Sequence, residues 1–415
     1  MSAPRVITMG CRLNAFESEL MRRHGEQGGL DDAVIINTCA VTAEAERQSR
    51  QAVRRARRDN PDAEIIVTGC AAQLDPEGFA AIPGVNRVVG NAEKLEPATF
   101  QTGDHPAVEV ADIMTVRETA PHLIDGFDGR ARAFVQIQQG CDHRCTFCII
   151  PFARGPNRSV PLGAIADQIR LLADSGHGEV VLTGVDIASY GGDLPGQPSL
   201  GDLVRRLLAA VPQLKRLRLS SIDPVVMDDA LFQALAEEER LMPHLHLSLQ
   251  AMDDMVLKRM ARRHSVADAM AYADRARKAR PDVVFGADLI AGFPTETDEM
   301  FRNTVREAHN LGVTHYHVFP YSERPGTPAA RMPTTPKPVR KQRAGVLRQS
   351  GDEALRAYLN SRVGGRAAVL LERDGAGFSE HYAQVQTDST APAGTVIEAR
   401  IDRAGDDRLF AKQAA

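Results

Sequence analysis

The stretch Gly140-Cys141-Asp142-His143-Arg144-Cys145-Thr146-Phe147-Cys148 determines how the rest of this chain is organised. Its three cysteines stand at C-x3-C-x2-C spacing, which suits three thiolates that fold over one face of a metal cluster. A [4Fe–4S] cluster needs four iron ligands, usually cysteine thiolates, so three local cysteines leave one iron open. The alternative is a zinc site, which prefers four protein ligands and would need a fourth one such as His143. The spacing favours the iron–sulfur cluster, because it is uncommon for zinc.

An iron without a protein ligand can be chelated by the amino and carboxylate groups of S-adenosylmethionine (SAM), which is then cleaved reductively. The C-x3-C-x2-C spacing with an aromatic residue before the last cysteine, here Phe147, resembles the radical-SAM superfamily. The resemblance implies that Cys141, Cys145 and Cys148 hold a catalytic cluster and that Phe147 lies at the cofactor.

The chain has 415 residues, of which 43% are apolar, so it is long enough for two to three domains with sizeable cores. It contains no run of about 18 apolar residues, which argues against a transmembrane helix and a membrane partner. Residues 1–5 lead directly into a short apolar strand and lack the apolar core of a signal peptide, so we expect a cytoplasmic protein. The formal net charge of −4 gives no sign of nucleic-acid binding by bulk electrostatics.

The other three cysteines close three similar segments near the N-terminus. Each segment is a short run rich in valine and isoleucine that ends in small or polar residues and then cysteine. The segments are Val6–Cys11, Val34–Cys39 and Ile65–Cys70. Such bounded apolar runs, with helical patterns between them, predict buried parallel strands in a βαβαβ unit.

The carboxyl ends of parallel strands share one edge of the sheet, so Cys11, Cys39 and Cys70 should converge there and hold a second cluster. The alternative is three independent core cysteines, since unpaired cysteine is often buried. We therefore predict an α/β fold that begins with a doubly wound parallel-sheet domain over residues 1–120. Gly126-Phe127-Asp128-Gly129 is typical of a linker.

From Ala131 the chain alternates predicted strands and helices, which suggests a partial (βα)6 barrel over residues 127–356. The predicted strands are Ala133–Gln138, Glu179–Thr183, Arg216–Ser220, Leu245–Leu249, Val283–Leu289 and His315–Phe319. In barrels of this kind the chemistry lies at the carboxyl ends of the strands.

Small and polar residues at these strand ends would let a cofactor approach the backbone closely. On this ground we expect SAM to contact Gly184, Ser221 and Gln250, and Arg263 from a basic segment at the same rim. The alternative for each residue is an ordinary turn or a solvated helix end.

The last part of the chain, residues 359–415, contains short alternating segments that predict a small β-barrel. These segments are Ala367–Glu372, His381–Gln386 and Val396–Arg400. Small β-barrels often bind RNA. Residues 361–415 carry 7 Arg and Lys against 8 Asp and Glu, so any RNA contact would need a local patch.

Motifs along the whole chain, taken together, resemble the methylthiotransferase family. In the N-terminal part these are Met9-Gly10-Cys11-Arg12-Leu13-Asn14, Ile36-Asn37-Thr38-Cys39-Ala40-Val41-Thr42 and Gly69-Cys70-Ala71-Ala72-Gln73. The others are the cluster loop from Cys141 to Gly155, and Gly377-Phe378-Ser379-Glu380-His381-Tyr382, which resembles the family's C-terminal TRAM module. The first two motifs are most similar to the branch that modifies threonylcarbamoyladenosine in tRNA.

The resemblance implies that a methylthio group replaces the hydrogen on carbon 2 of this adenine, in the anticodon stem-loop of tRNA. It implies two [4Fe–4S] clusters, on Cys141, Cys145 and Cys148 and on Cys11, Cys39 and Cys70, and two molecules of SAM. It further implies a reductase or flavodoxin-type electron donor and a sulfur donor as partners. The alternatives are the same reaction on isopentenyladenosine, and a non-catalytic iron–sulfur or zinc protein that binds RNA.

Overall fold

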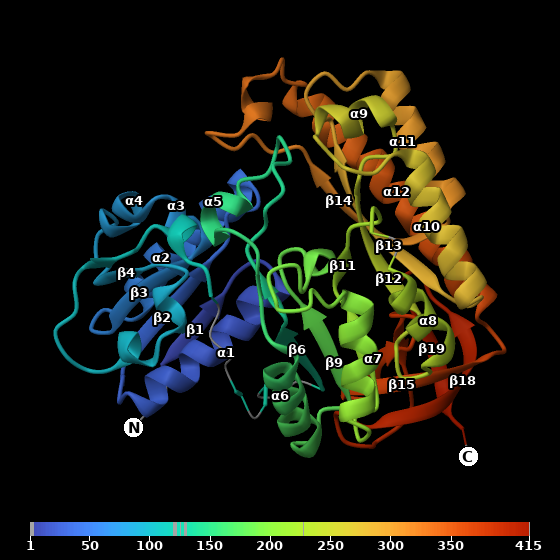
Figure 1. Cartoon of the computed structure of the whole chain (residues 1–415), viewed down its shortest axis with the longest axis horizontal. Coiled ribbons are helices and arrows are strands. Elements are labelled where there is room, and N and C mark those ends of the chain that lie inside the picture. The colour runs from blue at the N-terminus through green and yellow to red at the C-terminus, as the bar shows by residue number, and fades with distance from the viewer. Residues whose placement is uncertain (1–3, 119–122, 125, 128–130, 227, 415) are drawn as a thin grey trace.

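The computed structural model describes residues 4–118, 123–124, 126–127, 131–226 and 228–414. Asp128 and Gly129 of the predicted linker lie outside these residues. The chain forms an N-terminal parallel sheet, a central half-open barrel and a C-terminal β-barrel, which follow one another in sequence (Figure 1). No helix in the described ranges is long and apolar enough to cross a membrane.

The N-terminal sheet is entirely parallel, and its strands lie in sequential order. The strands are β1 (Arg5–Thr8), β2 (Ala33–Thr38), β3 (Glu64–Gly69), β4 (Arg87–Val89) and β5 (Val108–Glu109). Between and after them lie α1 (Arg12–Gln27), α2 (Ala43–Asp59), α3 (Cys70–Leu74) and α4 (Pro76–Ala80). This arrangement confirms the predicted α/β domain.

Helices cover both faces of this sheet. Successive side chains of a strand point to opposite faces, so the strands contribute apolar side chains to both. Met21 of α1 packs with Ile35 and Ile66 on one face. Val53 of α2 packs with Ile36 and Val67 on the other. Phe16 and Leu20 of α1 also belong to the hydrophobic core of the central barrel, so α1 joins the two parts.

The central barrel is formed by two parallel sheets that are continuous in sequence through Ser220. The first consists of β10 (Leu217–Leu219), β9 (Glu179–Thr183) and β6 (Arg132–Gln136), and the second of β11 (Ser221–Ile222), β12 (His244–Gln250), β13 (Val284–Ala291) and β14 (Val313–Pro320). Because β10 and β11 occupy one position, the partial six-unit barrel is confirmed. The predicted strand Ala133–Gln138 is interrupted, since Gln138 belongs to a separate two-stranded ribbon of β7 (Gln138–Gln139) and β8 (Arg158–Ser159).

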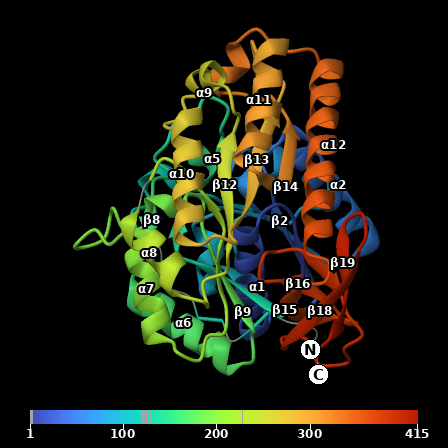
Figure 2. The same ribbon diagram turned by 90° about the vertical axis from the view of Figure 1, so that its right-hand side faces the viewer.

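The helices of the central part lie outside the barrel, and α10, α11 and α12 stand side by side in Figure 2. They are α5 (Ile150–Arg154), α6 (Leu162–Asp174), α7 (Leu200–Ala210), α8 (Asp229–Glu237), α9 (Asp254–Arg259), α10 (Val266–Ala279), α11 (Asp298–Leu311) and α12 (Lys337–Ser361). Helix α12 packs on β14, where Gly351 approaches Tyr316 so closely that an added Cβ would lie 2.6 Å from the Tyr316 Cβ. The same helix ends in the core of the C-terminal barrel through Leu359, so it spans the predicted boundary between residues 356 and 359.

The C-terminal module is a closed five-stranded barrel in the order β15-β16-β17-β19-β18, which confirms the predicted fold. Its strands are β15 (Arg366–Arg373), β16 (Ala376–Ser379), β17 (Gln384–Gln386), β18 (Val396–Ala404) and β19 (Arg408–Gln413). The prediction missed β16 and β19 and began β17 too early. Tyr382 has φ +68°, a left-handed conformation that interrupts an extended strand. The strand β17 therefore begins only at Gln384, two residues after Tyr382.

Candidate active site

The three N-terminal cysteines lie at the carboxyl ends of three neighbouring strands. Cys11 caps α1 after β1, Cys39 follows β2, and Cys70 opens α3 after β3. Gly10 has φ +89°, and an added Cβ there would lie 2.7 Å from the Cys39 Sγ. A glycine is therefore required at this position for the loop that carries Cys11 to approach Cys39.

A buried charged network supports these cysteines from the side of the central barrel. Arg154, at the end of α5, donates from Nε to the Cys70 Sγ at 3.1 Å and from Nη2 to the Asn14 Oδ1 at 2.5 Å. Its guanidinium also pairs with the Glu17 carboxylate, which lies 2.7 Å from the Lys94 ammonium. Burial would raise the pKa of Glu17, but Arg154 and Lys94 outweigh it and hold that pKa at about 2. The Glu17 carboxylate therefore remains ionised, while burial lowers the pKa of Lys94. The network connects the two cysteine-bearing parts of the chain.

Substitution Arg154→Met is expected to lower the free energy of unfolding by about 3 kcal/mol, because it leaves a buried carboxylate with only one of its two cations. Urea unfolding of the cluster-free protein measures this. The matched control is Arg170→Met, which removes an exposed arginine paired with Asp167 on α6 and should change the free energy by less than about 1 kcal/mol. Equal unfolding midpoints for Arg154→Met and Arg170→Met would contradict the role of the network.

The second set of cysteines lies in the loop after β7, at the open end of the central barrel. The Cys141 N–H donates to the Gly155 oxygen at 3.0 Å, and the Cys148 N–H to the Cys145 oxygen at 3.0 Å. Thr146 anchors the loop to the segment after α9, with its N–H donating to the Met260 oxygen at 2.9 Å. Backbone hydrogen bonds thus fix the shape of this loop.

Arg262 links this loop to the barrel wall. Its Nη1 lies 3.5 Å from the Cys145 Sγ, and its Nη2 lies 3.0 Å from the Asp223 Oδ2. The neighbouring Arg263, which the sequence predicts as a contact of SAM, also pairs with Asp223, at 3.2 Å, and its side chain is 39% exposed.

Distances between donor atoms limit which groups of residues could hold a single zinc ion. Two thiolates on one zinc ion lie no more than about 4.6 Å apart, since each Zn–S bond is about 2.3 Å. Among the described residues, the groups of three potential ligands whose donor atoms all lie within 4.8 Å are Cys141–His143–Asp186 and His246–Asp288–His317. Neither complete cysteine triad is such a group, whereas Cys141 belongs to the first one.

His143, the alternative fourth zinc ligand, belongs to the group with Cys141 and Asp186 and pairs with the carboxylate. Its Nε2 lies 2.7 Å from the Asp186 Oδ2. Burial raises the pKa of Cys39 to about 11 and the pKa values of Cys141 and Cys148 to about 12. These three thiols are therefore protonated at pH 7, and metal binding has to release their protons.

The predicted SAM contacts lie along the open rim and the inner wall of the barrel. Gly184 follows β9, and an added Cβ there would lie 2.7 Å from the Gln138 Oε1. Ser221 opens β11 with its hydroxyl 2.7 Å from that of Ser248, and Gln250 ends β12 with φ +66°. The Phe147 ring meets Phe293 edge to face at 6.5 Å, so it packs beside the loop after β13. Contact of these residues with SAM stays a prediction.

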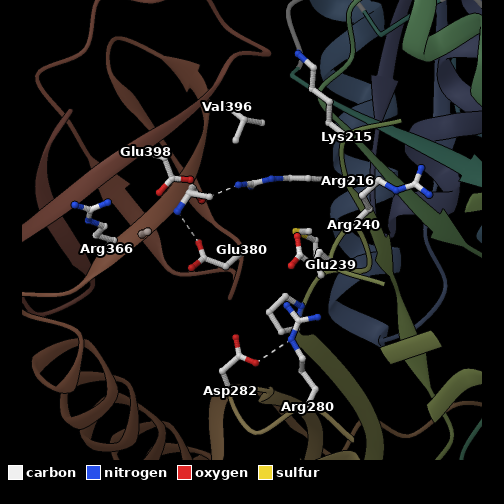
Figure 3. A pocket seen from close by; sticks show the side chains of 14 residues that line it. Lys215, Arg216, Glu239, Arg240, Arg280, Asp282, Arg366, Glu380, Val396 and Glu398 are labelled. Atoms are coloured by element: carbon white, nitrogen blue, oxygen red, sulfur yellow. Dashed lines mark hydrogen bonds and ion pairs between the residues drawn. The ribbon is translucent and has the colours of Figure 1, made fainter. Parts of the chain in front are cut away.

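A cleft of about 520 Å³ separates the base of the central barrel from the C-terminal module (Figure 3). Its charged lining residues are Lys215, Arg216, Glu239, Arg240, Arg280, Asp282, Arg366, Glu380 and Glu398. Arg216 reaches across it and donates to the Ala368 oxygen at 2.7 Å, and Arg280 pairs with Asp282 at 2.9 Å. Cations and carboxylates nearly balance, so this cleft is not the basic patch that an RNA contact of the module would need.

Comparison with known proteins agrees with this architecture. Residues 135–308 match the family model described as the Radical SAM superfamily, and residues 4–90 match the one described as uncharacterized protein family UPF0004. In fold, the chain is similar to the radical SAM methyltransferase TsrM from Kitasatospora setae, with TM-score 0.56 and 16% identity over 79% of this chain and 75% of that one. Fold and cysteine loop together define a radical-SAM enzyme with a second cysteine site.

Among curated proteins, the threonylcarbamoyladenosine tRNA methylthiotransferase MtaB of Rickettsia prowazekii is 49% identical, over 95% of this chain and 94% of that protein. The tRNA-2-methylthio-N(6)-dimethylallyladenosine synthase of Novosphingobium aromaticivorans is 34% identical, over 99% and 97%. The chain belongs to the methylthiotransferase family of radical-SAM enzymes, which use SAM and iron–sulfur clusters.

Proposed function

We propose that this chain replaces the hydrogen on carbon 2 of N6-threonylcarbamoyladenosine, next to the anticodon of tRNA, with a methylthio group. The observation that carries the proposal is the 49% identity, over nearly the full length of both chains, to a relative with that name. Four further relatives with the same name are 33–35% identical, over 90–98% of this chain.

In this proposal Cys141, Cys145 and Cys148 hold the cluster that binds SAM, and Cys11, Cys39 and Cys70 hold the second one. When bound, the clusters and SAM supply the radical that removes the hydrogen and the sulfur and methyl group that replace it. The chain's own residues position these groups. Arg262 directs an N–H at the Cys145 sulfur and Arg154 does the same at the Cys70 sulfur.

Two further partners and a location complete the proposal. A reductase or flavodoxin-type protein would supply the electron that SAM cleavage needs, and a separate donor would supply the sulfur. The reaction would take place in the cytoplasm, on the anticodon stem-loop of tRNA. We also assign Gly184, Ser221, Gln250, Arg263 and Phe147 to the surroundings of SAM.

The second candidate substrate is isopentenyladenosine. The observation in its favour is the 34% identity to the dimethylallyladenosine synthase over almost the whole chain. Nucleoside mass spectrometry of tRNA from cells that lack the chain separates the two, because only the methylthio form of the true substrate should disappear. A non-catalytic zinc protein is disfavoured by the match of residues 135–308 to the Radical SAM superfamily.

A further inference from the structure

One wall of the barrel interior carries a connected row of polar side chains. The Ser221 and Ser248 hydroxyls lie 2.7 Å apart, and Ser221 donates to the Asp288 Oδ2 at 3.2 Å. The other oxygen of Asp288 lies 3.2 Å from the His246 Nε2 and 2.7 Å from the His317 Nδ1.

The alternation along β12 shows that this row faces the interior. Leu245, Leu247 and Leu249 lie in the hydrophobic core shared with the outer helices, so His246 and Ser248 face the opposite side. At the rim Arg262 connects β12 to the cluster loop, since it donates to the Ser248 backbone oxygen at 2.8 Å and lies 3.5 Å from the Cys145 Sγ. The His317 side chain is 61% exposed, so the row is open to a ligand.

The floor of the barrel lies below this row and is formed with the help of the C-terminal module. Tyr382 stacks on the His244 ring at 5.0 Å and on Phe378 at 5.0 Å. Two arginines of the barrel, Arg132 and Arg218, lie over its ring at 5.2 and 5.0 Å. Each has a carboxylate partner at 2.7 Å, from Glu372 and Glu179 respectively.

Arg12 reaches the same tyrosine from the N-terminal domain. It follows Cys11 directly, and its Nη2 donates to the Tyr382 hydroxyl at 3.1 Å. Within the part of the chain that the structure describes, no carboxylate lies within 4.0 Å of its guanidinium, in contrast to Arg132 and Arg218. Arg12 is therefore a half-buried cation without an acidic partner, placed beside a cluster cysteine and at the base of the polar row.

We propose that the Arg12 guanidinium and the Tyr382 hydroxyl bind the carboxylate of the threonylcarbamoyl group, and that this contact selects the substrate. The inference rests on the proposed function. A guanidinium presents paired N–H donors that match a carboxylate, and the tyrosine hydroxyl can donate its own hydrogen while it accepts from Arg12.

The chemistry of the substrate fits this position. Carbon 2 and carbon 6, which bears the substituted nitrogen, flank the same ring nitrogen of adenine. The carboxylate and the reacting carbon can therefore lie on the same side of the base, next to the domain that holds Cys11. An isopentenyl group has no acceptor for Arg12 and would leave this cation unpaired, which costs binding energy.

The test uses the reconstituted holoenzyme and three anticodon stem-loops, which carry threonylcarbamoyladenosine, its methyl ester or isopentenyladenosine. Fluorescence anisotropy gives the dissociation constants, and the readout is the ratio of the constant for the ester to that for the acid. Arg12→Met should weaken binding of the acid about 10- to 100-fold and bring this ratio close to one. Arg12→Lys, which keeps the charge without the fork, should give an intermediate ratio.

The control variant is Arg302→Met, which removes the same charge from an exposed position of α11 and should keep the wild-type ratio. A wild-type ratio in Arg12→Met would overturn the inference, even if the affinities for acid and ester both fell by the same factor. The proposed function fails separately, if the wild-type enzyme forms no methylthio product from the acid stem-loop.

Discussion

Cys39→Ala is expected to cleave SAM and release 5′-deoxyadenosine without forming any methylthiolated nucleoside. Cys39 lies at the end of β2, whereas the SAM-binding cluster is assigned to a loop of the central barrel. Two cysteines, Cys11 and Cys70, are too few to hold a four-iron cluster firmly, so the second cluster should be lost. The iron content should then fall from about eight to about four atoms per chain.

Both products of the Cys39→Ala reaction can be measured by mass spectrometry in one mixture with the tRNA stem-loop. Deoxyadenosine at the wild-type level with no methylthio product is the expected pattern. Methylthiolated nucleoside at the wild-type level would mean that Cys39 is an ordinary core cysteine, and the argument from three converging strand ends would fail with it.

Cys145→Ala should form neither deoxyadenosine nor the methylthio product. Cys145 is the central residue of the C-x3-C-x2-C loop, and its sulfur is the one that Arg262 approaches at 3.5 Å. Removing it leaves two thiolates in the loop, and the open iron that binds SAM is lost with the cluster. The N-terminal site should keep its four irons, because Arg154 and its partners remain in place.

The two cysteine variants act as controls for each other, since each removes one buried or half-buried thiol and should remove one cluster. Deoxyadenosine formation by reduced Cys145→Ala at the wild-type level would show that SAM is cleaved elsewhere. Loss of all iron in either variant would show that the two sites do not fold independently.

Local sequence patterns predicted the elements that repeat. Val34–Cys39 and Ile65–Cys70 read as buried strands followed by cysteine, and the structure has β2 and β3 there, fully or almost fully buried. The parallel sheet then places the strand ends side by side without further information. A small C-terminal β-barrel was also predicted, although β16, which has only four residues, and β19 were missed.

Long-range contacts were not predictable from local patterns. Arg154 ends a helix of five residues, and nothing in that segment indicates that it reaches Cys70, 84 positions away. Arg262 and Arg263 are adjacent and chemically identical, so only the path of the chain after α9 determines which of them meets Cys145. Arg12 and Tyr382 are separated by 370 positions and meet only because all three parts of the chain pack together.

The central claim, that this chain methylthiolates threonylcarbamoyladenosine in tRNA, is tested most directly by nucleoside mass spectrometry. The tRNA is taken from cells that lack the chain and from the same cells supplied with the wild type or with Cys39→Ala. We predict that the 2-methylthio form is absent without the chain, restored by the wild type and still absent with Cys39→Ala, while threonylcarbamoyladenosine itself persists. Unchanged 2-methylthio threonylcarbamoyladenosine in cells without the chain, with loss of the isopentenyl counterpart instead, would contradict the account.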